Sequence, residues 1–250
     1  MTAETDFEFE LESFRKEEEV AQQYFFAWLG FRDHAGRSED VLKLLNETPL
    51  LWITTHHALL VASFVALGRI FDQKSKHNVD RLLGAASRHP EIFSRAFLGV
   101  RKEKSAGIGR TFAVEYAANA YEPTAADFRA LRKEIHIQRR IYESRYRDVR
   151  DKVFAHKGLS ELDDINALLA RTNIQEMKAM FSFLYALHEA LWELYFNGRK
   201  PEIAMRSFEL PPQSKTQGNR TLPGEIVAHD AVNFFEGVLE TRRANKNPGR

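Results

Sequence analysis

The sequence predicts an all-α fold, and three observations support this. Apolar residues recur at three- and four-residue steps through several long stretches, and no alternating pattern of useful length indicates a strand. Residues that commonly cap helices stand where these stretches begin and end. Hydrophobic residues make up 44% and charged residues 28% of the 250 positions, as is typical of a globular chain. We expect a helical domain over 1–205, followed by a linker and an amphipathic helix over 206–250.

The first third of the chain predicts three helices. Thr5 could cap a helix that carries an apolar face as far as Phe31, and Ser38 opens a short second helix. Pro49 suits the first position of the next helix, over 49–71, which is apolar nearly all round and is expected to be the central core helix. Shorter helices are expected over 78–86, 90–100 and 111–121, with a loop over 102–110.

The longest helix is expected between Thr124 and Gly158. Thr124 with Asp127 forms a capping-box pattern, and Gly158 suits the residue that closes the last turn. One side is apolar: Phe128, Leu131, Ile135, Tyr142, Tyr146, Val149 and Val153. The other side is cationic: Arg132, Lys133, Arg139, Arg140, Arg147 and Arg150. Apolar packing, positive charge and the imidazole of His156 therefore meet at one helix end.

The last third predicts two more long helices. Asn173 caps an amphipathic helix that Gly198 ends. The Pro- and Gly-containing stretch 209–224 is the best linker candidate, and 225–243 is expected to dock on the body of the protein or on a second chain.

Composition narrows the function. A net charge of +1 predicts no global attraction to nucleic acid or membrane, so any electrostatic site must be local. With no cysteine, disulfides, thiolate metal sites and cysteine nucleophiles are excluded. The N-terminus lacks the pattern of a secretory signal, and the most apolar run, 58–67, is shorter than the ~20 residues that cross a bilayer. We expect a soluble, cytoplasmic protein with no membrane partner.

The end of the long helix carries a motif. In Arg150-Asp151-Lys152-Val153-Phe154-Ala155-His156, five residues separate an arginine from a histidine, and a polar residue follows the arginine. This pattern resembles the signature of the HEPN superfamily, helical bundles that often act as RNA-cleaving toxins or defence effectors. The sequence RDKVFAHKG resembles the abortive-infection U-type branch of this superfamily. In that branch an earlier core helix tends to end in a run like Ala-Leu-Gly-Arg-Ile-Phe-Asp, which stands here at 66–72. The resemblance covers roughly residues 10 to 200.

The resemblance implies a metal-independent endoribonuclease without a cofactor. His156 would act as general acid or base, and Arg150 as a clamp on the scissile phosphate. Asp151 would orient a histidine of its own or of the other chain, or else form a salt bridge with a neighbouring cation. Arg147 and Lys157 would contact RNA. The expected partners are RNA, a second copy of the chain in a homodimer, and an antitoxin or other protein.

Helix geometry raises the question of a second copy. On an ideal helix, Arg150 and His156 lie about 9 Å apart and roughly 120° around the axis, so they cannot grip one phosphate together unless the last turn opens. One histidine also cannot easily be base and acid in the same step. In HEPN nucleases, the resemblance implies, two copies of the motif face one cleft.

Other interpretations compete with catalysis. Cations at a helix end are favoured by the helix dipole alone. The chain could be a non-catalytic HEPN module that binds RNA, a nucleotide or a protein, or a scaffold in which the motif is accidental. Some HEPN toxins are controlled by modification of a tyrosine two residues after the histidine, but Gly158 stands here. His56 and His57 are adjacent on a helix and cannot share a metal, so one is expected to be hydrogen-bonded in the core.

Overall fold

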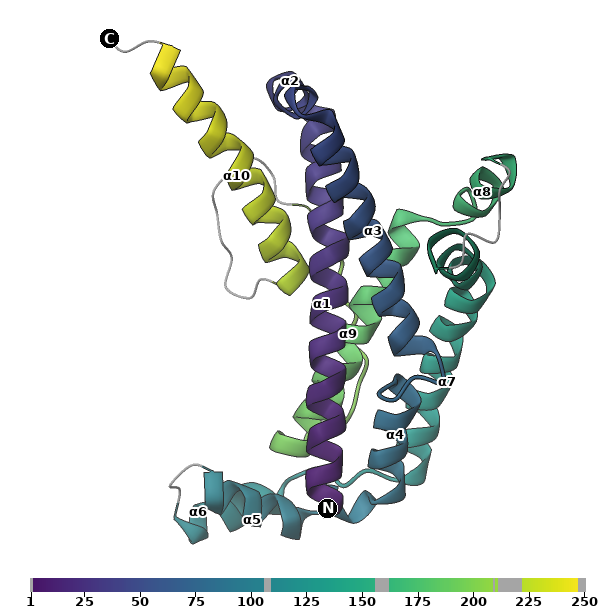
Figure 1. The fold of residues 1–250 in the computed structure, drawn as a ribbon. Coiled ribbons are helices and arrows are strands. Elements are labelled where there is room, and N and C mark those ends of the chain that lie inside the picture. The colour runs from purple at the N-terminus through teal and green to yellow at the C-terminus, as the bar shows by residue number, and fades with distance from the viewer. Residues whose placement is uncertain (1, 106–108, 156–161, 209, 211–221, 247–250) are drawn as a thin grey trace. The chain divides into compact units, whose positions relative to one another are not determined.

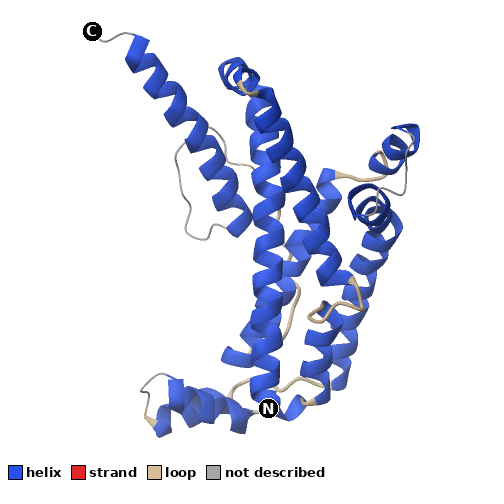
Figure 2. Ribbon diagram, in the orientation of Figure 1, coloured by secondary structure: helices blue, strands red, loops and turns tan. Residues whose placement is uncertain are grey.

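A computed structural model shows helices throughout the part of the chain that it describes (Figure 1). The described residues are 2–105, 109–155, 162–208, 210 and 222–246. No strand occurs within these ranges, and Figure 2 shows helices joined by loops. The prediction of an all-α fold is confirmed.

The long helices are α1 (Ala3–Arg37), α3 (Pro49–Phe71), α7 (Ala125–Ile141), α9 (Ile174–Asn197) and α10 (Pro223–Lys246). The shorter ones are α2 (Glu39–Glu47), α4 (Val79–Arg88), the 3-10 turn η1 (Pro90–Phe93), α5 (Arg95–Ser105), α6 (Arg110–Ala118) and α8 (Leu162–Leu169). Two π-helical segments, η2 (Tyr142–Tyr146) and η3 (Val149–Ala155), continue α7. The prediction of a loop over 102–110 is wrong for its first residues, because α5 extends to Ser105.

The chain divides into two compact units. The first contains Met1–Glu18 and Gly68–Ser207, and the second contains Glu19–Leu67 and Phe208–Arg250. Helices α1 and α3 are each divided between the two units. The sequence did not indicate that 19–67 would group with the C-terminal segment. The expected division after residue 205 stays a prediction.

Aromatic side chains fill the core of the first unit. Phe7 of α1 packs on Phe93 and on Tyr195 of α9, with ring centroids 5.1 and 5.0 Å apart, and Phe93 also contacts Phe128 of α7. The apolar stripe of α7 is buried here, as expected. Burial of these large rings fixes α7 against α4 and α9 and so positions the helical segment that follows it.

The ends of these helices carry the expected caps. Asp127 Oδ2 accepts hydrogen bonds from the backbone N–H and the hydroxyl of Thr124, completing the capping box. Asn173 caps α9 through its side-chain oxygen. Gly198 ends α9 with φ +61°, and a Cβ there would lie 2.5 Å from the Cβ of Ala120, so glycine is required.

Arg139 is not on the solvent side of α7, where the sequence placed it. Its side chain is 5% exposed; Nη2 lies 2.5 Å from Asp80 Oδ2 on α4, and Nε donates to the carbonyl of Phe71. The helical pattern put Arg139 between Ile135 and Tyr142, and these are both buried. A partner on another helix therefore decided the burial of this cation, and the sequence pattern could not show that partner.

In the second unit, α10 packs on α1 and α2 of the same chain. Phe235 and Leu239 of α10 form a buried cluster with Val41 of α2. Close approach depends on Gly30, where a Cβ would lie 3.2 Å from the Cα of Ala228. Arg242 pairs with Glu47 through both of its Nη atoms. The amphipathic C-terminal helix thus docks on the chain's own helices.

The expected core helix, α3, is buried only in its second half. Phe64, Ala66, Leu67, Ile70 and Phe71 are 0–2% exposed. Its first half exposes Leu50, Leu51 and Ile53 by 79%, 60% and 66%, because the helix extends past the packing it meets there. By length and composition alone α3 is the one helix within the described residues that could cross a membrane; 22% of its apolar window is buried. A single helix of this kind is weak evidence, since core helices of soluble proteins have the same length and composition.

Replacing Arg139 by leucine should lower the free energy of unfolding by about 3 kcal/mol, because Asp80 and the Phe71 carbonyl lose their buried partner. Arg140→Leu is the matched control: this neighbouring cation is exposed, and its loss should change stability by no more than about 0.5 kcal/mol. Urea denaturation of the two variants measures the difference. Equal stabilities would contradict a structural role for Arg139.

Candidate functional site

Three of the five predicted site residues lie in the helical continuation of α7. Arg147 lies between the two π-helical segments, and Arg150 and Asp151 belong to η3. His156 and Lys157 lie outside the described residues, as does Gly158. Regular α-helix ends at Ile141, and the wider π turns beyond it do not have the residue spacing of an ideal α-helix. The separation expected between Arg150 and His156 stays a prediction, because His156 lies outside the described residues.

The guanidinium of Arg150 lies among three neighbours. Its Nε donates a hydrogen bond of 2.6 Å to Asp151 Oδ1, and its Nη2 lies 3.7 Å from Asp72 Oδ2. Its Cζ lies 6.0 Å from the ring centroid of Tyr142. The side chain is 16% exposed. Burial by itself would lower the pKa of Arg150, but the hydrogen bond to Asp151 and the electrostatic interactions with Tyr142, Asp151 and Asp72 together outweigh burial, and the pKa is raised. Arg150 is therefore a fixed, permanent positive charge.

Asp72 is held in place by the turn that ends α3. Its Oδ1 accepts the backbone N–H of Lys74 at 3.0 Å, and its carbonyl accepts the backbone N–H of Ser75. Asn78 closes the same loop by donating to the carbonyls of Gln73 and Ser75. A carboxylate fixed by its own turn faces Arg150 without further rearrangement. Asp72 is thus a preformed partner of the motif arginine.

Gly68 makes room for Arg150. A Cβ at residue 68 would lie 2.2 Å from Arg150 Nη1 and 2.6 Å from its Cδ, so any side chain there would force the Arg150 side chain to move. Arg69, the next residue, points elsewhere and pairs with Glu17 at 2.8 Å. Two runs noticed separately in the sequence, 66–72 and 150–156, thus meet at one place through Gly68, Asp72 and Arg150.

Tyr142 is a member of this site that the sequence pattern assigned to the core alone. Its ring stacks on Phe71, with centroids 5.3 Å apart and planes inclined by 21°. Burial raises the pKa of Tyr142 far above its ordinary value, so the phenol keeps its proton. Among the described residues the hydroxyl has no hydrogen-bond partner. The signal was available: a tyrosine in a buried stripe brings a hydroxyl that requires a partner, where phenylalanine would not.

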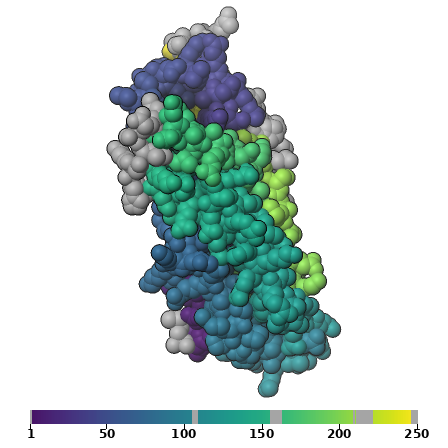
Figure 3. All heavy atoms as spheres, turned by 90° about the vertical axis from the view of Figure 1, so that its right-hand side faces the viewer, coloured from purple at the N-terminus to yellow at the C-terminus, as the bar shows by residue number. Residues whose placement is uncertain are grey.

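These residues border a small cavity of about 90 Å³. It is lined by Phe71, Asp72, Gln73, Lys74, Tyr142, Glu143, Arg147 and Arg150. Arg147 lies at its edge and is exposed; its ion pairs are long, 3.9 Å to Glu143 and 3.8 Å to Asp151. In the space-filling view much of the teal segment after residue 125 lies at the surface (Figure 3). The lining therefore combines a half-buried arginine, Arg150, with an exposed one, Arg147.

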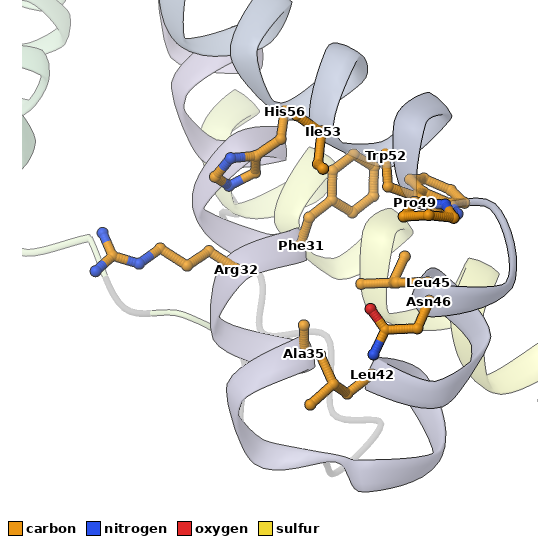
Figure 4. Close-up of a pocket in the computed structure, with 10 residues that line it drawn as sticks. All are labelled: Phe31, Arg32, Ala35, Leu42, Leu45, Asn46, Pro49, Trp52, Ile53 and His56. Atoms are coloured by element: carbon orange, nitrogen blue, oxygen red, sulfur yellow. The ribbon is translucent and has the colours of Figure 1, made fainter.

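A larger and mainly apolar pocket of about 310 Å³ lies in the second unit (Figure 4). Phe31, Trp52 and Leu45 contribute to its walls, and the guanidinium of Arg32 points away from these side chains in the view. Its lining is Phe31, Arg32, Ala35, Leu42, Leu45, Asn46, Pro49, Trp52, Ile53 and His56. This pocket offers no pair of acid and base groups for RNA cleavage.

His56 borders that pocket and is engaged by a neighbour. Trp28 Nε1 donates a hydrogen bond of 3.1 Å to its Nδ1, which confirms that one of the adjacent histidines is hydrogen-bonded. The expected place in the core is wrong, because His56 is half-buried and His57 is exposed. Burial, and then the charge of Arg32, lowers the pKa of His56. Within the described ranges no group of three or more histidine, aspartate or glutamate side chains could hold a metal ion.

The all-α bundle agrees with the fold that the HEPN resemblance implies. The sequence matches the family HEPN_AbiU2, described as AbiU2, over residues 4–214. The chain therefore belongs to the AbiU2 family of HEPN domains, whose name refers to abortive infection. No curated protein and no solved structure matches it.

Gly68→Ala should lower the free energy of unfolding by about 1–3 kcal/mol, because the new methyl group displaces the Arg150 side chain. Gly84→Ala is the control: its Cβ meets nothing within 4 Å, so helix propensity alone should raise stability by about 0.5–1 kcal/mol. In an Arg150→Ala background Gly68→Ala should behave like the control. Purely additive effects in urea denaturation would contradict the contact.

Tyr142→Phe should leave the free energy of unfolding unchanged or raise it by about 1 kcal/mol, because the buried hydroxyl that it removes has no partner. Tyr146→Phe serves as the comparison. The Tyr146 hydroxyl lies 2.8 Å from Glu176 Oε2 and accepts the backbone N–H of Asn173, so its loss should cost about 1–2 kcal/mol. Thermal unfolding of both variants tests this. A Tyr142→Phe protein as unstable as Tyr146→Phe would show that the Tyr142 hydroxyl makes a stabilising hydrogen bond, contrary to this prediction.

Proposed function

We propose that this chain is a metal-independent endoribonuclease of abortive infection. It would cleave RNA by attack of a 2′-hydroxyl on the adjacent phosphate, leaving a 2′,3′-cyclic phosphate. His156 would act as general acid or base, and Arg150 would hold the charge that develops on the phosphate. The observation that carries the proposal is the preformed position of Arg150, which Gly68 admits and two carboxylates orient.

Preorganisation is the physical reason for this choice. A guanidinium already fixed in a mainly buried site loses little conformational freedom when a phosphate arrives, and its planar fork can hold two oxygens. Asp151 fits a supporting role here, because it binds Nε and leaves the Nη groups of Arg150 toward the cavity and Asp72. Arg147 and Lys157 would guide the RNA strand.

We further propose that the active form is a cytoplasmic homodimer. Cleavage requires a base for the 2′-hydroxyl and an acid for the 5′-oxygen, and one His156 does not supply both in one step. Two copies of the motif in one cleft would supply both. Gly158 stands where some HEPN toxins have the tyrosine that an antitoxin modifies. An antitoxin or other protein partner would therefore have to act without that modification, for example by binding over the cleft.

A non-catalytic HEPN module that binds RNA, a nucleotide or a protein is the second candidate. One observation favours it: Asp72 and Asp151 already neutralise the charge of Arg150 within one chain. In that case Arg150 would stabilise the fold, and substitution at His156 would not change any reaction. An assay of cleavage separates the two candidates.

In the presence of excess chelator, the wild-type protein should cut cellular RNA and leave 2′,3′-cyclic phosphate ends. His156→Ala should reduce the rate by about 10²–10⁴-fold. Arg150→Ala should reduce it by about 10²–10³-fold. Arg140→Ala, which removes an exposed cation from the same helix, should stay within about twofold of wild type.

Thermal unfolding of each variant checks that the fold is intact. Equal cleavage by wild type and His156→Ala would identify a contaminating nuclease. Binding of RNA without cleavage by any of the proteins would favour the second candidate, and activity lost on chelation would contradict a metal-independent reaction.

A further inference from the structure

The cavity beside Arg150 contains a polar group that neither the fold nor the proposed acid–base chemistry uses. Tyr142 is 1% exposed, and within the described part of the chain its hydroxyl has no hydrogen-bond partner. Leaving a buried hydroxyl unpaired is unfavourable, so such a group often marks a position where a ligand supplies the missing partner. Tyr142 and Arg150 line the same cavity.

One cation in the lining of this cavity is available to an anion. Lys74, Arg147 and Arg150 line it together with two carboxylates, Asp72 and Glu143. Asp72 is already engaged by the Lys74 backbone N–H and faces Arg150, while Glu143 is exposed and lies 3.9 Å from Arg147. Asp151, outside the lining, also binds Arg150, so three carboxylates lie near three cations, and all three carboxylates pair with Arg147 or Arg150. Among the described residues Lys74 has no carboxylate partner, and its ammonium group is left for a ligand.

The size of the cavity limits the anion. A volume of about 90 Å³ corresponds to about three water molecules, enough for one tetrahedral oxyanion but not for a base or a sugar. Its donors come from two directions: the turn after α3 contributes Lys74, and the helical segment after α7 contributes Tyr142 and Arg150. Donors that converge from separate elements on a small space suit a phosphate group.

We propose that this cavity is a phosphate subsite for RNA, in which Tyr142 donates a hydrogen bond to a phosphate oxygen and Arg150 and Lys74 supply the charge. The subsite rests on the proposed function, because it takes RNA to be the ligand. Burial raises the pKa of the Tyr142 phenol, so Tyr142 remains a hydrogen-bond donor at neutral pH. Phe71 holds the ring from the opposite face, so the hydroxyl is fixed before the ligand arrives.

The test is binding of an RNA strand with every 2′-hydroxyl methylated, which removes the nucleophile and prevents cleavage. Tyr142→Phe and Lys74→Gln should each raise the Kd about tenfold or more, as expected for loss of a hydrogen bond or charge at a phosphate. Tyr116→Phe is the matched control: its hydroxyl lies on α6, 3.3 Å from the Asn197 carbonyl, and its loss should leave the Kd unchanged. The melting temperature of Tyr142→Phe should be no lower than that of wild type, so that weaker binding cannot be attributed to unfolding.

A second arm uses inorganic phosphate at constant ionic strength, with stabilisation against heat as the readout. A difference between wild type and Tyr142→Phe in the RNA arm supports the subsite. A difference confined to inorganic phosphate overturns its assignment to RNA. Equal affinities in both arms, or a wild type that binds neither probe, overturn the subsite.

Cleavage of unmodified RNA separates this inference from the nuclease proposal. Wild-type protein that binds the methylated strand through Tyr142 but cuts no RNA would sink the nuclease and leave the subsite standing. Protein that cuts RNA with the same KM in wild type and Tyr142→Phe would keep the nuclease and sink the subsite.

Discussion

The contact between Arg150 and the end of α3 is the constraint on which the site depends. Arg150 occupies its position because residue 68 has no side chain to displace it, and Asp72 and Asp151 pair with two sides of its guanidinium group. Each partner is fixed independently, Gly68 by a buried helix and Asp72 by the turn that Asn78 closes. A charged group is thus held by packing as much as by charge, and this arrangement makes the guanidinium rigid.

The same contact explains why the site lies where it does. The capping box and the aromatic core around Phe128 hold helix α7 in place. The direction of the helical segment after Ile141 is therefore fixed as well. Its π-helical turns bring Tyr142 against Phe71 and Arg150 against Gly68. Wider turns of this kind are frequent at functional sites, because they displace side chains from regular helical positions. The end of one helix and the turn after another together build the cavity.

Much of the fold could be predicted from the sequence. The features that could not be predicted depend on contacts between helices. The apolar stripe and the Thr124 cap gave the helix, because both are local patterns. Arg139 is buried because Asp80 of another helix pairs with it, and Leu50 is exposed because no other helix covers it. The spacing of apolar residues along the sequence shows neither of these tertiary contacts. The runs 66–72 and 150–156 were both noticed, but only three-dimensional structure shows that Gly68 and Asp72 serve Arg150. Tyr142 was counted as core because its ring is apolar, although its hydroxyl is not.

We propose that Asp72 and Arg150 act as one unit in RNA cleavage, and a double-mutant cycle on the cleavage rate tests this most directly. Asp72→Asn removes the carboxylate charge at nearly constant shape, and Arg150→Lys keeps the positive charge but loses the planar fork. If the two residues form one site, the double variant should lose less activity than the product of the single losses, with a coupling of at least about 1 kcal/mol. Independent, multiplicative losses would contradict the account, and so would full activity in Arg150→Lys.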